Sequence, residues 1–420
     1  YGNQDLYQGT WGMNWRSIWN ESLYSNTSIA LTSSQYNEDF YEAFTGKYAI
    51  RNRTNDLEFK LRNVNHKQFD DRLSLDFGLD AKRLDNDYDN WLAATTNAVG
   101  DTIDAFTLQD ELGGNKMGIF ASLNIRLTDR LSTVLGGRAD YFSYNENTNY
   151  SPRISCRYQL SDRTYLNASY GIYYQNLPML LLSQKDENKE LADPKAIHYI
   201  LGMEHLLSED TKLGIEIYQK EYSHFPMDPD QPALFVIDDD FFNYYESLTD
   251  KGRAMSRGIE LTLQKKLAEN IYGLTSAAYF RSRYKGLDGV WRDRSYDNRL
   301  LLSVEGGYKP NPGLEMSMRW IYAGGVPYTP FDIDLSNANG YGVLDESRIN
   351  SERYPDYHSM NVRVDKRFFF AKTNLVVYVS VWNAYNQKNI AEYFWNDAKE
   401  KVEAIYQWTM LPILGAEWEF

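Results

Sequence analysis

Long apolar runs are absent from this 420-residue chain, and none approaches the roughly 18 residues that a transmembrane helix needs. A helical membrane protein is therefore excluded. Cysteine is also scarce: the single Cys156 cannot form an internal disulfide, and its neighbours at every second position place it on an apolar face as a small hydrophobe. The net charge of −14 leaves no basic footprint, which argues against a nucleic-acid partner.

Catalytic and metal-binding patterns are missing too. The five histidines are scattered, with no His-x-x-x-His pair or comparable metal spacing, and no Gly-x-Ser-x-Gly elbow occurs. We therefore expect neither an enzyme nor a resident metal or cofactor.

What the chain does contain is a period of two, repeated over segments of about ten residues. In the segment 115–127, Met117, Ile119 and Leu123 share one face, while Lys116 and Asn124 share the other. Side chains alternate across a strand, so each such segment has an apolar face and a wet face. An arginine facing the bilayer midplane would cost about 2–4 kcal/mol, and the charges of these strands fall on the polar face instead.

The connections between these strands are sorted by length. Tight turns near 128–130, 161–163, 208–210 and 268–270 alternate with long loops such as 85–114, 224–250 and 327–355. Short turns on the periplasmic side and long loops on the outside are typical of an outer-membrane barrel. Together with 34 tyrosines for interfacial girdles, this predicts an all-β, antiparallel transmembrane β-barrel, with a soluble β-protein as the distant alternative.

The number of strands expected from the sequence is odd, which predicts that the complete barrel has more strands than this sequence contains. We count about 17 strands, starting near Trp11, whereas bacterial single-chain barrels have an even number and leave no edge open in lipid. The chain also starts at Tyr1 without a methionine or signal peptide. We therefore expect a mature or truncated sequence that begins inside a barrel.

Several segments resemble the TonB-dependent outer-membrane receptors, particularly the Bacteroidetes-type members, and they occur in the family's order over most of the chain. They are GRADYF at 137–142, SPRIS at 151–155, ASYG at 168–171, RGIEL at 257–261, RYPDYH at 353–358, VDKRF at 364–368 and LGAEWEF at 414–420.

This resemblance implies a multi-pass protein of the Gram-negative outer membrane that imports a scarce solute with energy delivered by TonB. It also implies a 22-stranded barrel behind an N-terminal plug that contacts TonB. Residues 1–420 contain nothing that resembles a plug, so they are expected to form the barrel portion without the plug and the first strands. The terminal Phe420 resembles the signal that the barrel-assembly machinery reads.

Three loops hold the candidate ligand-binding residues. Aromatic and acidic side chains at an extracellular mouth can stack on a ligand or bind a polar group, but they can equally pack on a neighbouring loop with solvated acids. The candidates are Phe235, Asp238, Asp239, Asp240, Phe241, Phe242, Tyr244, Tyr245, Trp291, Arg292, Arg294 and Trp395. The arginines of the loop 284–294 are also candidates for contact with lipopolysaccharide phosphates, and the loop 386–403 for contact with a surface lipoprotein.

Charged residues on the polar faces are expected to line the barrel lumen. They are Arg126, Arg138, Asp140, Arg153, Arg157, Glu305, Arg319, Arg363 and Asp365. In a receptor they would hold the plug, whereas in an open porin they would set ion selectivity. Two alternatives to a receptor therefore stay open: a plugless passive channel, and a structural barrel that docks a surface lipoprotein.

Overall fold

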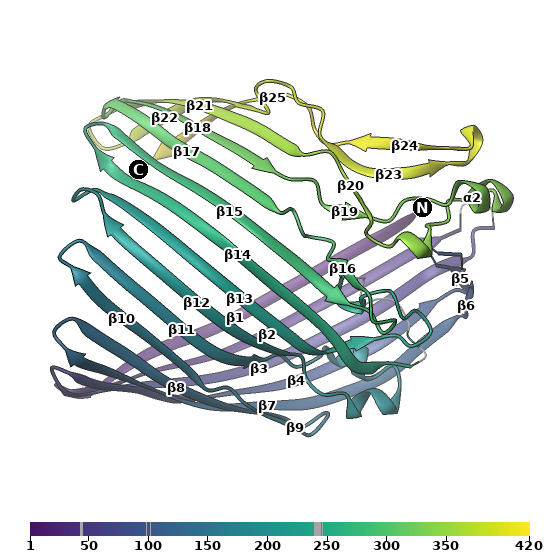
Figure 1. The fold of residues 1–420 in the computed structure, drawn as a ribbon, viewed down its shortest axis with the longest axis horizontal. Coiled ribbons are helices and arrows are strands. Elements are labelled where there is room, and N and C mark those ends of the chain that lie inside the picture. The colour runs from purple at the N-terminus through teal and green to yellow at the C-terminus, as the bar shows by residue number, and fades with distance from the viewer. Residues whose placement is uncertain (43–44, 98, 101, 239–244, 246) are drawn as a thin grey trace.

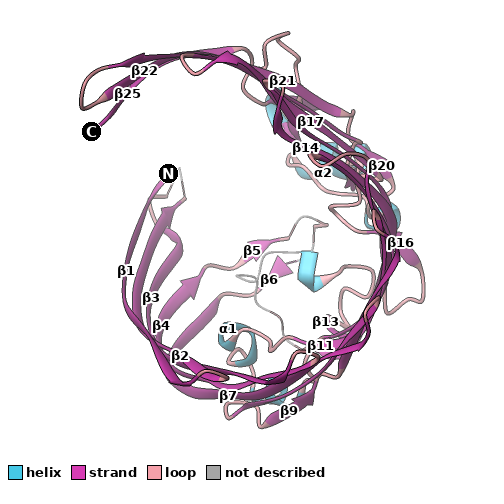
Figure 2. Ribbon diagram, turned by 90° about the vertical axis from the view of Figure 1, so that its left-hand side faces the viewer, coloured by secondary structure: helices cyan, strands magenta, loops and turns pink. Residues whose placement is uncertain are grey.

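The computed structural model describes residues 1–42, 45–97, 99–100, 102–238, 245 and 247–420. Its main body is a single antiparallel sheet of 19 strands that curls into an open cylinder (Figures 1 and 2). None of the described helices is long and apolar enough to span a bilayer. The all-β, antiparallel fold expected from the sequence is confirmed.

The strands of the main sheet fall into two sets. Seventeen are long: β1 (Gly2–Asn20), β2 (Leu23–Tyr41), β3 (Tyr48–Asp70), β4 (Leu73–Leu92), β7 (Phe106–Thr128), β8 (Leu131–Phe142), β10 (Arg153–Ser161), β11 (Thr164–Tyr174), β12 (Lys195–Leu206), β13 (Thr211–Met227), β14 (Thr249–Ala268), β15 (Ile271–Lys285), β17 (Leu300–Asn311), β18 (Leu314–Ala323), β21 (Tyr357–Phe369), β22 (Asn374–Trp382) and β25 (Leu411–Glu419). Two are short extensions: β9 (Asn147–Tyr150) and β16 (Trp291–Asp293).

The long loops contain small elements of their own. These are three hairpins, β5 (Thr95–Thr96) with β6 (Thr102–Ile103), β19 (Pro327–Tyr328) with β20 (Glu352–Arg353), and β23 (Ile390–Asn396) with β24 (Lys401–Tyr406), two α-helices, α1 (Met179–Leu182) and α2 (Ile333–Asn339), and four 3₁₀ turns, Asp186–Glu190, Val236–Asp238, Glu346–Arg348 and Asp397–Lys399.

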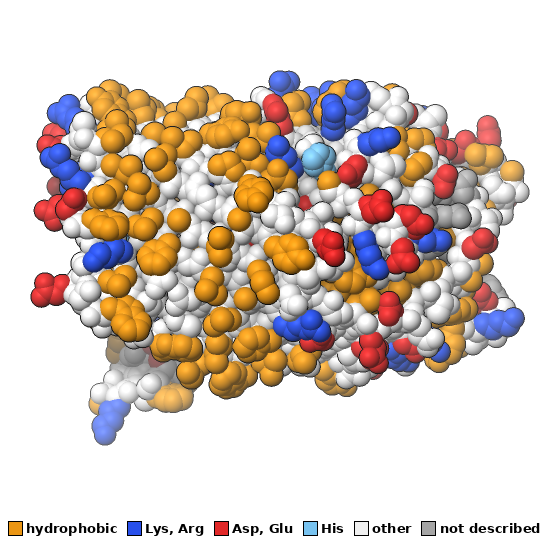
Figure 3. All heavy atoms as spheres, turned by 90° about the horizontal axis from the view of Figure 1, so that it is seen from below, with side chains coloured by type: hydrophobic (Ala, Val, Ile, Leu, Met, Phe, Trp, Pro, Cys, Tyr) orange, Lys and Arg blue, Asp and Glu red, His pale blue; other side chains and the backbone are white. Residues whose placement is uncertain are grey.

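The cylinder has an apolar outer wall. Residues that pair across antiparallel strands share a face, and the row that contains Leu75, Leu123, Leu135 and Ile154 is apolar on all four strands. Hydrophobic side chains cover the wall on the short-turn side of the molecule, and charged ones gather toward the long-loop end (Figure 3). This is the distribution that a lipid belt requires.

The two edge strands of the sheet are unpaired on their outer sides. Among the described residues β1 pairs only with β2, and β25 pairs only with β22, so the cylinder stays open between them (Figure 2).

Several strands are far longer than a bilayer needs. β3 and β7 each have 23 residues, whereas about 9–11 tilted residues cross a membrane. The residues 85–92 and 106–114, which the sequence analysis assigned to a loop, continue β4 and β7 in register. The sheet therefore rises above the membrane as a wall, and the buried hydrophobic clusters of the described residues lie in this raised part, around Phe142 and Leu181 and around Met227 and Tyr284.

Placing a charge on the apolar wall tests this orientation. Leu135→Arg should lower the free energy of unfolding in lipid vesicles by about 2–4 kcal/mol, because Leu135 lies in the apolar row. The matched variant is Asn124→Arg on the polar face of β7, where Asn124 donates to Asp76 Oδ2 over 2.9 Å and the new cation has a carboxylate beside it. Urea unfolding should show little change for Asn124→Arg, and equal losses for both variants would refute the assigned faces.

Candidate ligand-binding site

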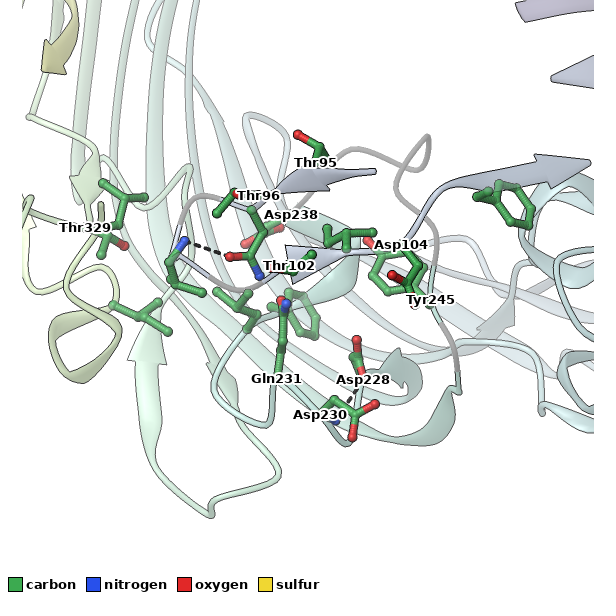
Figure 4. A pocket seen from close by; sticks show the side chains of 18 of the residues that line it. Thr95, Thr96, Thr102, Asp104, Asp228, Asp230, Gln231, Asp238, Tyr245 and Thr329 are labelled. Carbon is green, nitrogen blue, oxygen red and sulfur yellow. Dashed lines mark hydrogen bonds between the residues drawn. The ribbon is translucent and has the colours of Figure 1, made fainter. Parts of the chain in front are cut away.

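A cavity of about 930 Å³ lies among the loops at the raised end of the cylinder. Its wall is assembled from four parts of the chain: the β5–β6 hairpin with the start of β7, residues between Asp228 and Asp238 together with Tyr245, the end of β15 with Ser295, and the loop between β18 and β21 (Figure 4). The β5–β6 hairpin lies within the ring of strands when the cylinder is viewed along its axis (Figure 2). The volume of the cavity is within the range of small-molecule sites.

An aromatic stack forms one wall of the cavity. Phe235 is only 4% exposed and stacks on Tyr284 of β15, with ring centroids 4.8 Å apart and an interplanar angle of 18°. The Tyr284 hydroxyl donates to the Ala233 carbonyl over 2.8 Å, and burial raises the pKa of this phenol, so it stays protonated. The loop residues 228–238 are thus anchored to the sheet.

A second anchor joins the two loops that the sequence analysis singled out separately. Arg294 donates through Nε to Asp238 Oδ1 over 3.1 Å, and the Ser295 amide donates to the other oxygen of Asp238 over 3.2 Å. The Arg294 guanidinium also lies 5.0 Å from the centroid of the Phe235 ring. The two loops therefore form one unit at the cavity wall.

The remaining predicted ligand-binding residues are placed differently. Tyr245 is buried and lines the cavity, and its amide donates to Gln184. Arg292 pairs with Asp288 over 2.6 Å, and that hydrogen bond lowers the pKa of Asp288. Trp291 and Arg292 do not line the cavity, nor does Trp395, which packs on Phe331 with ring centroids 6.2 Å apart. Asp239, Asp240, Phe241, Phe242 and Tyr244 lie outside the described residues.

The structure adds lining residues that the sequence analysis did not single out, some apolar, such as Val99, Ile103, Phe106, Leu234, Leu344 and Ile349, and others polar. The polar ones are mainly threonines and acids. They include Thr95, Thr96, Thr102, Asp104, Thr107, Asp228, Asp230, Gln231, Thr329 and Asn350. The threonines of the β5–β6 hairpin, Thr95, Thr96 and Thr102, were the one feature of the sequence that could have indicated this part of the wall. β-branched residues favour strands, so they favour a short hairpin inside a long polar loop.

The charge of the cavity is one-sided. Four aspartates line it, and the described lining residues include no lysine, arginine or histidine. One of the four, Asp238, is already paired with Arg294. No group of three or more His, Cys, Asp or Glu side chains suited to a metal ion occurs within the described ranges. The arrangement suits hydrogen bonding to a hydroxyl- or amine-bearing molecule and disfavours an anion.

The predicted lumen residues form several ion pairs on the polar face. Arg138 contacts Asp140 over 2.6 Å and Asp80 over 3.9 Å, while Arg363 contacts Asp365 over 2.5 Å and lies over the Tyr378 ring.

The others are spread around the cylinder. Arg157 pairs with Glu204 over 3.3 Å and Arg319 with Glu305 over 3.5 Å. Arg126 and Arg153 are aligned across the strands with Ser132 and Gly136, on the same face as Arg138.

The sequence matches the family described as TonB dependent receptor-like, beta-barrel, over residues 1–384. Among curated proteins none matches. Solved structures of similar shape include the siderophore receptor PiuA from Acinetobacter baumannii (TM-score 0.70, 12% identity, covering 100% of this chain and 64% of that one). The pyoverdine outer membrane receptor FpvA from Pseudomonas aeruginosa, bound to pyoverdine, is another (TM-score 0.73, 14% identity, 100% and 62%), as is the ferric yersiniabactin uptake receptor FyuA from Yersinia pestis (0.65, 13%, 100% and 61%).

This chain spans less than two thirds of the length of each of these receptors, and at such low identity the likeness shows the fold alone. The family is one of outer-membrane transport receptors and not of enzymes. The chain belongs to the TonB-dependent receptor family and represents its outer-membrane β-barrel.

Proposed function

We propose that this chain is the barrel portion of an energy-coupled receptor that captures a scarce solute outside the cell and imports it. The observation that carries the proposal is the 930 Å³ cavity, which loops from four parts of the barrel build at the raised end. Rigid strands hold a site of this kind in place, whereas the loop residues that line it can change without changing the barrel.

The lining argues for one class among the metal chelates, vitamins and glycan fragments that such a receptor could import. Threonine hydroxyls, Gln231, Asn350 and aspartate oxygens offer many hydrogen-bonding groups. An anionic chelate would be brought beside Asp104, Asp228 and Asp230 with no lining cation among the described residues, which costs free energy. We therefore favour a neutral or cationic, hydroxyl-rich solute such as a glycan fragment.

Import requires parts beyond this chain. We propose that further strands pair with the open edges of β1 and β25 to complete a 22-stranded barrel, because unpaired backbone groups are costly in lipid. A plug domain would lie in the lumen against the ion pairs around Arg138 and Arg363, and TonB would act on that plug.

Other partners follow from the same proposal. The barrel-assembly machinery would bind the C-terminal strand through the fully exposed Phe420. A surface lipoprotein would dock on the outer loops, including the β23–β24 hairpin. The segments between residues 137 and 420 that together resemble this family support a Bacteroidetes-type receptor.

Binding measurements on the full-length receptor test the site. A panel of oligosaccharides and ferric chelates is screened by calorimetry, and the variant lacking residues 235–245 should lose affinity for the bound solute while the barrel remains folded on heat-modifiability gels. Asp104→Lys and Asp230→Lys should each weaken binding about tenfold or more, because each puts a cation into an acidic cavity. The control is Glu346→Lys, which lies outside the lining. Unchanged affinity in the deletion variant would show that the solute binds elsewhere.

A further inference from the structure

Four arginines surround two aspartates at the raised end of β15, and two of them, Arg281 and Arg283, lie on the outer face of that strand. Asp293 contacts Arg281 over 3.1 Å, Arg299 over 3.0 Å and Arg353 over 2.7 Å, and lies 3.4 Å from Arg283. Asp297 contacts Arg353 over 2.7 Å as well. We call this set the arginine cluster.

The cluster is layered, with its acids underneath. The side chain of Asp297 is fully buried and that of Asp293 is 12% exposed, whereas Arg281, Arg283 and Arg299 are 35–42% exposed. The guanidinium groups are thus the outermost part, and they outnumber the carboxylates two to one. The surface presented to the surroundings is positive, in a chain whose net charge is −14.

Strand register places the cluster at the edge of the apolar wall. Tyr279 is aligned with Ile259, and both are exposed apolar residues of the outer face. Arg281 lies two residues further along the same face of β15 and is aligned with Arg257 of β14. Arg283 lies two residues beyond Arg281 and is aligned with Met255. The arginines therefore begin in the row that directly follows the lipid-facing one.

Two further arginines extend this patch without partners of their own. Arg253 and Arg257 are exposed on the outer face of β14, and neither makes an ion pair within the part of the chain that the structure describes. Lys285 is aligned with Arg253, and the acid nearest in register is Glu221, which is aligned with Met255 on β13. Seven cations therefore face three carboxylates: Arg253, Arg257, Arg281, Arg283, Lys285, Arg299 and Arg353 against Glu221, Asp293 and Asp297.

We propose that this patch binds the phosphate groups of lipid A, the anionic headgroup of the outer leaflet. Planar guanidinium groups bind phosphate oxygens in pairs, and a headgroup phosphate of the surrounding lipid lies at the height where the apolar wall ends. The arginines of the 284–294 loop contribute less here, because Arg292 and Arg294 are only 14% and 20% exposed in their pairs with Asp288 and Asp238. The inference rests on the outer-membrane placement of the barrel and not on the imported solute.

Native mass spectrometry of the full-length receptor tests the proposal. The probes are diphosphoryl lipid A and the same lipid without its phosphates, each added to protein in mild detergent. We expect binding of diphosphoryl lipid A that weakens about thirtyfold in the double variant Arg253→Gln/Arg257→Gln, since each basic residue near an anionic surface contributes a few-fold in affinity. Arg257→Lys keeps the charge but loses the paired donors, so its affinity should lie between those of the wild type and the double variant.

The control variant Lys399→Gln/Lys401→Gln removes two charges from the β23–β24 hairpin and should bind lipid A as the wild type does. Equal binding of the phosphate-free lipid would overturn the proposal, as would unchanged binding in the Arg253/Arg257 variant. Displacement of lipid A by inorganic phosphate at low millimolar concentration would show a site for free phosphate instead.

Discussion

Replacing Phe235 by alanine should release the loop residues 228–238 from the sheet and weaken solute binding. Phe235 is 4% exposed and stacked on Tyr284, and truncating a buried phenylalanine costs about 3–5 kcal/mol. The loss should appear in the local opening free energy of this segment and not in the unfolding of the barrel, because the strands below keep their pairing. Hydrogen exchange of the amides at 234–238 should therefore accelerate at least a hundredfold.

Trp291→Ala is the matched control for that experiment. Trp291 is another aromatic residue that the sequence analysis proposed for ligand contact, but it is 38% exposed and lies outside the cavity lining. Its truncation should leave exchange at 234–238 and solute affinity nearly unchanged. If Phe235→Ala exchanges at the wild-type rate, the stack on Tyr284 does not hold the loop.

Replacing Arg353 by alanine should detach the loop between β18 and β21 from the sheet. Arg353 donates to the Gly325 carbonyl over 2.8 Å and to Asp293 and Asp297 over 2.7 Å each. Asp297 is fully buried, and removing one partner of a buried charge costs about 3–5 kcal/mol. Arg281 and Arg299 still face these carboxylates, so we expect the lower end of that range.

Limited chymotrypsin digestion of the folded receptor measures this effect, because cleavage after the aromatic residues of the loop 324–355 reports local opening, and neither variant removes such a site. Arg353→Ala should be cut at least tenfold faster there, while the strands stay resistant. The control is Arg348→Ala, whose pair with Glu352 is about half exposed and is expected to contribute under about 1 kcal/mol. Equal cleavage of both variants would mean that Arg353 does not fasten the loop.

The sequence predicted the membrane-spanning part of the fold well, because only there do the two faces of a strand meet different solvents. The count of about 17 strands agrees with the number of long strands, although β1 begins at Gly2 and not near Trp11. The short strands β9 and β16 were missed, since four and three residues are too few to show a period. The raised parts of β4 and β7 were assigned to a loop for a related reason: above the membrane both faces are wet, so residues such as Asp85, Asn86 and Asp87 show no alternation.

The candidate site was only partly predictable. Phe235, Asp238 and Tyr245 do line the cavity. The partners of the first two, Tyr284 and Arg294, lie far away in the sequence, after β14. The contribution of the β5–β6 hairpin depends on how far β4 and β7 rise, which the sequence pattern did not reveal. The aromatic and acidic residues of one loop therefore indicated one wall of the cavity, and the sequence did not indicate the other walls.

Uptake of the bound solute with and without TonB tests the central claim most directly. Cells that produce the full-length receptor are given the labelled solute identified by the binding screen, and its accumulation is compared with that in an otherwise identical strain lacking TonB. An energy-coupled receptor predicts accumulation against a gradient that disappears in the strain without TonB, while binding at the cell surface persists. Equal, gradient-limited entry in both strains would contradict the account and indicate a passive channel.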